Sequence, residues 1–85
     1  MRQFSYTIKT ISGLHAAPAA LLAQEVRKYE SFVSIGKGAA ETDAAKLMKV
    51  MAMLIGQGDT VTVRVEGDDE EEAFRAIKAF FERYL

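Results

Sequence analysis

Hydrophobic and polar residues alternate in short stretches of this chain, a pattern that is typical of β-strands with one buried face. The clearest stretch runs from Thr60 to Glu66, where valines occupy every second position. Phe4 to Ile8 alternates in the same way, and Phe32 to Ile35 predicts another strand. The Gly-Lys-Gly sequence at 36–38 predicts a tight hairpin, from which residues 39–43 return as a short edge strand.

Three other stretches have the spacing of amphipathic helices. The first spans Ala16 to Tyr29, and the second is the Met- and Leu-rich stretch from Ala45 to Ile55, in which we expect Val50 and Leu54 to lie in the core. A third follows Gly67. The stripes expected to be buried in the first and third helices are Ala19, Leu22, Ala23, Val26 and Tyr29, and Ala73, Phe74, Ile77, Phe81 and Tyr84.

The start of the third helix has its own sequence signals. Asp68 or Asp69 can cap the helix N-terminus, because a short carboxylate side chain can accept a hydrogen bond from a free first-turn N–H. Glu70, Glu71 and Glu72 follow in the first turn, where the helix dipole favours negative charge. We therefore read this acidic run as a helix start and not as a metal site.

The predicted order of elements is βαββαβα. Because alternation leaves Thr60, Thr62, Arg64 and Glu66 on a polar face of the sheet, helices are expected on the other face only. This predicts an α+β fold with an antiparallel sheet. The chain has 85 residues without a linker or a repeat, which predicts a single domain over residues 1–85.

Composition and charge exclude several classes of function. The net charge of -1 argues against a nucleic-acid-binding protein, which usually carries a basic excess. The chain has no Cys and one His, so we expect neither a disulfide nor a metal site. No apolar run approaches the roughly 20 residues of a membrane span, and the N-terminus lacks the apolar core of a signal peptide. We expect a cytoplasmic protein without membrane insertion.

The one histidine, His15, is the strongest candidate for chemistry. It precedes the first predicted helix and is expected to be its N-terminal cap, with the ring exposed. An imidazole can accept a phosphoryl group, and first-turn backbone N–H groups can hold the oxygens of that group. Ala16 and Ala17 follow directly, and their small side chains leave those N–H groups accessible.

Residues 13–20 read Gly-Leu-His-Ala-Ala-Pro-Ala-Ala, which resembles the active-site signature of the histidine-containing phosphocarrier protein (HPr) family of the bacterial sugar phosphotransferase system. The likeness covers the whole chain, including the Met-rich second helix and the run from Gly58 to Val63. It implies an open-faced β-sandwich, in which three helices cover one face of a four-stranded antiparallel sheet. It also implies a monomer without a cofactor.

The resemblance implies a relay. His15 would accept a phosphoryl group on Nδ1 from enzyme I, which phosphoenolpyruvate charges, and would pass it to sugar-specific enzyme II A domains. The protein would then be a phosphohistidine intermediate and not an enzyme with its own turnover. Transcriptional regulators are further partners that the sequence leaves open. In the family the second helix carries an exposed hydrophobic patch, for which we expect Leu47, Met48 and Met51, with Lys49 at the rim.

Two positions depart from the family pattern. Ala17 stands where the family usually has an Arg that pairs with the phosphoryl group, and Lys46 stands where many members have a regulatory Ser. We hypothesise that Lys46 supplies positive potential near His15, with a solvated lysine as the alternative. Ala17 also motivates a second hypothesis, a regulatory protein-binding module of HPr type with weak or no carrier activity. A ferredoxin-like ligand-binding domain shares the βαββαβ order and is a third.

Overall fold

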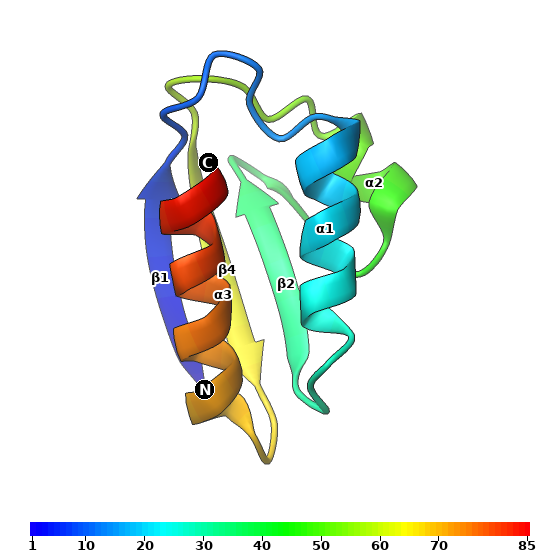
Figure 1. The fold of residues 1–85 in the computed structure, drawn as a ribbon, viewed down its shortest axis with the longest axis vertical. Helices are drawn as coiled ribbons and strands as arrows, with labels where there is room; N and C mark the ends of the chain where they lie inside the picture. Colours follow the sequence, from blue (N-terminus) through cyan, green and yellow to red (C-terminus); the bar gives the residue numbers. More distant parts are fainter.

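The computed structural model describes all 85 residues, and four strands form one antiparallel sheet in the order β1-β4-β2-β3 (Figure 1). The strands are β1 (Arg2–Thr7), β2 (Phe32–Lys37), β3 (Ala40–Asp43) and β4 (Thr60–Glu66). Val63 of β4 is paired with Phe4 on one side and with Ile35 on the other. The valine-rich strand thus lies inside the sheet, and β1 and β3 form its edges.

The alternation in β4 has the predicted consequence for the two faces of the sheet. Val61, Val63 and Val65 are buried, whereas Thr60 and Arg64 are exposed. On the polar face of β2, Ser34 is also buried, and its hydroxyl is satisfied by the hydrogen bond that it donates to the Glu41 carboxylate on β3 at 2.8 Å.

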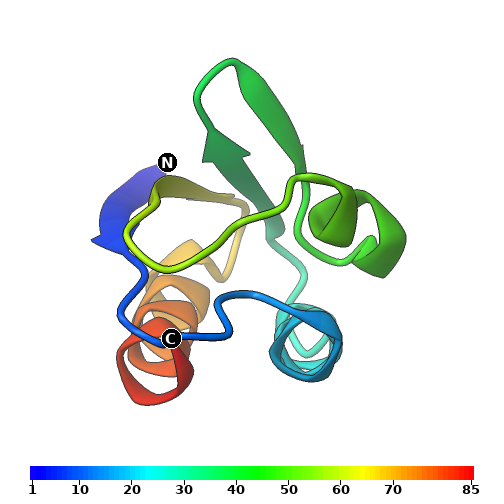
Figure 2. The ribbon, with the colours of Figure 1, turned by 90° about the horizontal axis from the view of Figure 1, so that it is seen from above.

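Helices α1 (Ala16–Val26) and α3 (Glu70–Tyr84) cover the other face of the sheet (Figures 1 and 2). The short helix α2 (Leu47–Ala52) lies beside α1 and β3. Eighteen buried apolar residues form one continuous core, with Phe81 the largest fully buried side chain. The predicted open-faced β-sandwich is confirmed.

Two helices are shorter than the sequence pattern predicts. Helix α1 ends at Val26, because Lys28 and Tyr29 donate to carbonyls three residues back in place of four. Helix α2 begins only after Lys46, since the Asp43 carboxylate accepts a hydrogen bond from the Ala45 N–H and holds the chain in a turn. It ends before Leu54, whose φ of 54° lies in the left-handed region.

Two burial predictions are wrong. Leu54 is 80% exposed and not in the core, because its left-handed backbone turns the side chain outward. Tyr84 is 42% exposed, and Phe80 is buried in its place beside the Tyr84 ring at 4.7 Å between centroids. Tyr29 lies beyond the end of α1 but is partly buried against the core, on the side of the predicted stripe.

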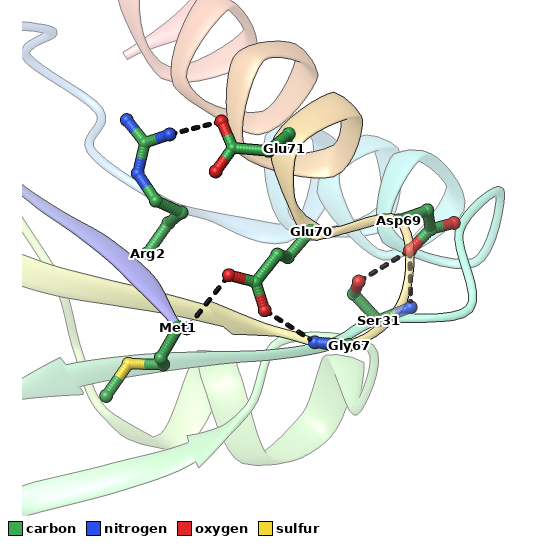
Figure 3. Close-up of polar contacts among 7 residues, drawn as sticks. All are labelled: Met1, Arg2, Ser31, Gly67, Asp69, Glu70 and Glu71. Carbon is green, nitrogen blue, oxygen red and sulfur yellow. Dashed lines mark hydrogen bonds and ion pairs between the residues drawn. The ribbon is translucent and has the colours of Figure 1, made fainter.

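Carboxylate side chains at the N-terminus of α3 form hydrogen bonds and ion pairs with neighbouring segments of the chain (Figure 3). Asp69 is the N-cap residue, as predicted, but its carboxylate accepts hydrogen bonds from the backbone N–H groups of Glu30 and Ser31 and from the Ser31 hydroxyl. These bonds, led by that of the hydroxyl, lower the pKa of Asp69. The Glu70 carboxylate accepts a hydrogen bond from the Gly67 N–H, and the Glu71 carboxylate forms an ion pair with Arg2 of β1.

Candidate functional site

His15 is the N-cap residue of α1, and its side chain is exposed and caps no backbone group. Its backbone is extended, with φ of −85° and ψ of −171°, while its carbonyl accepts the first helical hydrogen bond from the Ala19 N–H at 2.9 Å. The ring therefore projects from the helix end into solvent, as the sequence predicted.

The loop before His15 is held in place by contacts with the segment that follows α2. Leu14 is buried, and its N–H donates to the Ile55 carbonyl at 3.0 Å. Gly13 has a φ of +65°, and a Cβ added there would lie 2.6 Å from that same carbonyl oxygen. A buried leucine and a glycine in close contact thus bring His15 to one defined place above the segment that leaves α2.

The first turn of α1 has free donors. The N–H groups of Ala16 and Ala17 have no acceptor within the helix, because the helix starts at Ala16. Both residues are exposed, and no acidic side chain occupies the first turn. An anion beside the His15 ring would meet these two donors and the positive end of the helix dipole.

Two cavities flank the His15 ring. The larger, of about 560 Å³, is lined by ten residues that include Lys9, Ser12, Ala17 and Tyr84. The smaller, of about 340 Å³, lies toward α2 and is lined by Ser12, Leu14, His15, Met51, Leu54 and Ile55. His15 thus has room on both sides, with an apolar wall on the side of α2.

The residues predicted for the hydrophobic patch lie on α2, next to this wall. Met48 is 75% exposed, Leu47 and Met51 are half-buried against the core, and Lys49 is exposed. The structure adds Leu54, which sequence reasoning assigned to the core. The sequence contains no signal for its left-handed backbone, since Gly and Asn are the residues that usually adopt it.

Lys46 lies apart from this group. It is the N-cap of α2, whereas the α2 side of the cavity beside His15 is lined by Met51 and by the residues after the helix. At the other end of α1, the Arg27 guanidinium donates to the Ala45 carbonyl at 2.8 Å. Lys46 is therefore next to the C-terminal end of α1, and His15 is at the N-terminal end.

An open-faced sandwich with one exposed histidine at a free helix N-terminus defines a small phosphocarrier-type protein. The family model "PTS HPr component phosphorylation site" matches residues 2–83. The chain belongs to the HPr family. It is similar to the phosphocarrier protein HPr of Mycoplasma pneumoniae, with 34% identity over 99% of this chain and 97% of that protein. A crystal structure of HPr from Thermoanaerobacter tengcongensis has 38% identity and a TM-score of 0.91, covering 96% of this chain and 92% of that chain.

The chain is also similar to proteins that are described as HPr-like and named Crh. The chain is 41% identical to the HPr-like protein Crh of Halalkalibacterium halodurans, over 89% of this chain and 90% of that protein. A crystal structure of Crh from Bacillus subtilis, described as a swapped dimer, has 30% identity and a TM-score of 0.78. It covers 100% of this chain and 98% of that chain. None of the three helices has the length and apolar character that a bilayer-spanning segment needs.

Proposed function

We propose that this protein relays a phosphoryl group from enzyme I to enzyme II A domains of the sugar phosphotransferase system through His15. The observation that carries the proposal is the exposed His15 ring beside the two free N–H groups of Ala16 and Ala17. Membership of the HPr family supports the phosphocarrier class. The relay would take place in the cytoplasm, the location that we expect from the sequence.

In the proposed relay, the phosphoryl group passes from the donor to His15 and then from His15 to the acceptor. The Nδ1 lone pair of His15 forms a bond to phosphorus while the bond between phosphorus and the donor atom of enzyme I breaks. The donor keeps that electron pair, and the phosphoryl oxygens turn toward the N–H groups of Ala16 and Ala17. In the second step a nucleophile of the acceptor bonds to phosphorus while the P–N bond at His15 breaks, and Nδ1 keeps that electron pair, so that the protein returns unchanged.

Incubation with enzyme I and phosphoenolpyruvate tests the proposal. We expect a phosphoryl adduct that is labile in acid and stable in base, as a phosphoramidate is, and that the His15→Ala variant does not form. The Gln24→Ala variant is a matched control, because Gln24 is exposed on the same helix. The proposal would be abandoned if the wild-type protein formed no adduct on His15.

A regulatory protein-binding module of HPr type is the second candidate. It is favoured by Ala17, which provides no charge for a phosphoryl group, and by the 41% identity with an HPr-like protein Crh. The same incubation separates the two candidates. A module of this kind would bind protein partners through α2 while its His15 stayed unmodified, whereas the carrier would bind and become phosphorylated.

We propose further that Leu47, Met48, Lys49 and Met51 dock the protein partners, since this mostly apolar surface adjoins the cavity beside His15. Met side chains adapt to more than one partner surface. The Lys46 hypothesis receives less support. Because Lys46 lies at the far end of α2, we expect Lys46→Ala to leave the transfer rate nearly unchanged at physiological ionic strength.

The variant Met48→Asp tests the docking surface. Met48 is 75% exposed, so the substitution removes little packing and places a charge in an apolar contact. We expect the affinity for enzyme I to fall at least about tenfold, which isothermal titration calorimetry would measure. The circular dichroism spectrum and the Tm should stay as in the wild type. Unchanged affinity would show that partners dock elsewhere.

A further inference from the structure

A phosphoryl group on His15 would bring two negative charges to a site whose nearest helical residues, Ala16 and Ala17, have no charged side chain. Of the eleven Lys and Arg residues, Lys9 is the one that lines either cavity beside His15. It contributes to the wall of the larger cavity, together with Ala17. The small side chain at Ala17 leaves the space between them open.

The backbone of Lys9 is held firmly although its side chain is exposed. Its N–H donates to the main-chain oxygen of Leu85 at 2.6 Å, and its carbonyl accepts a hydrogen bond from the Gln57 amide at 3.1 Å. Leu85 itself is buried in the core. In Figure 2 the segment after β1 passes the end of α3 before it reaches α1. Lys9 lies in this segment and lines the same cavity as Ser12, Gly13 and His15.

The Lys9 ammonium is also not engaged by an acidic side chain. The five ion pairs of the structure use the N-terminus, Arg2, Lys28, Lys37 and Arg64, and none involves Lys9. Its one partner is the Tyr6 ring, whose centroid lies 5.7 Å from Nζ. A flexible, solvated lysine can leave such a contact and turn toward a dianion.

We propose that Lys9 binds the phosphoryl group held on His15 and supplies the positive charge that the first turn of α1 lacks. The N–H groups of Ala16 and Ala17 hold the oxygens on the helix side, and the ammonium contacts them from across the larger cavity. This inference rests on the proposed phosphorylation of His15. The positive charge that offsets the phosphoryl group would thus come from the loop after β1 and not from α1 or α2.

The test compares Lys9→Met and Lys9→Arg in the transfer from phosphorylated enzyme I, measured by rapid quench. Methionine keeps an unbranched side chain of nearly the same length and removes the charge, whereas arginine keeps the charge. We expect Lys9→Met to slow the transfer about tenfold and Lys9→Arg to stay within about threefold of the wild type. The matched control is Lys28→Met, which removes one charge beyond the other end of α1 and should change nothing.

A second measurement separates charge compensation from a purely structural role. The protein phosphorylated chemically with phosphoramidate, without enzyme I, should show a ³¹P resonance of phosphohistidine that moves in Lys9→Met and stays in place in Lys28→Met. Loss of transfer in both Lys9 variants, or equal loss in Lys28→Met, would overturn the inference. So would a Lys9→Met protein with wild-type rate and resonance. Absence of any adduct in the wild type would instead overturn the proposed function itself.

Discussion

At the scale of single residues, Ala17 determines the chemical character of the site. The free N–H groups of the first turn can bind an anion, but the larger cavity beside His15 has no charged group on its helix side. A charge-assisted hydrogen bond to a phosphoryl oxygen contributes about 1.5–3 kcal/mol. Whether the protein is a fast relay therefore depends on the charges that surround His15.

The substitution Ala17→Arg adds a guanidinium at this position. We expect the rate of phosphoryl transfer to rise about ten- to a hundredfold if the new contact forms mainly in the transition state. Rapid-quench kinetics with phosphorylated enzyme I would measure the change. Gln24→Arg is the control, because it adds the same charge to an exposed position two turns along α1. An equal gain in both variants would indicate general attraction of the partner and no local contact.

Gly13 is the second residue on which the site depends, because its backbone is left-handed and in contact with the chain after α2. We expect Gly13→Ala to destabilise the protein by more than the about 1–3 kcal/mol of backbone strain alone, since the new Cβ would lie 2.6 Å from the Ile55 oxygen. Urea unfolding measures the loss. Gly38→Ala is the matched control, with a φ of +60° and no atom within 4 Å of the added Cβ. Similar losses in the two variants would refute the role of the contact.

At the scale of elements, the ends of the helices decide how the layers are joined. The Asp69 carboxylate at the start of α3 holds the loop between α1 and β2 through Glu30 and Ser31. The length of α2 is set in a similar way by Asp43 and by the left-handed Leu54. The Asp69 contacts join segments far apart in the chain, whereas the Asp43 bond and the Leu54 backbone are local. Neither kind of feature follows from the apolar spacing of a helix, which is why the predicted ends of α1 and α2 are wrong.

The role of Asp69 predicts a dependence of stability on pH. Because its hydrogen bonds lower its pKa, the folded protein binds the proton less readily than the unfolded chain does. The stabilisation is thus present at neutral pH and is lost as the pH falls below about 4 through the folded pKa. We expect Asp69→Asn to lower the Tm at pH 7 and to have a smaller effect at pH 3. Asp68→Asn, at an exposed neighbour, should show neither effect in thermal scans.

For the whole molecule, the contacts of edge strand β1 bear on the oligomeric state. Edge strand β1 is held within its own chain by pairing with β4, by the Arg2–Glu71 ion pair and by Phe4 against Phe81. A domain swap would reproduce these same contacts between two copies, and it would gain no contact energy while it lost the entropy of free monomers. The relatives described as dimers show that the fold permits other assemblies.

We therefore predict a monomer at micromolar concentration. Light scattering coupled to size-exclusion chromatography should give a mass near 9.4 kDa. A mass of twice that value, independent of dilution over an hour, would contradict the prediction and indicate an exchanged strand. Dilution is the control, because a weak surface dimer dissociates whereas a swapped dimer must first unfold its exchanged element.

Three features could be predicted from the sequence alone: the order of the elements, the face of β4 that is buried and the exposed position of His15. These follow from local periodicity and from a helix start, which depend on neighbouring residues only. The tertiary structure decided the strand order, the outward turn of Leu54, the burial of Phe80 and the place of Lys9 beside His15. The strand order, the burial of Phe80 and the place of Lys9 depend on contacts between segments far apart in the chain, which no pattern of one segment contains. The outward turn of Leu54 comes from a left-handed backbone that its residue type does not signal.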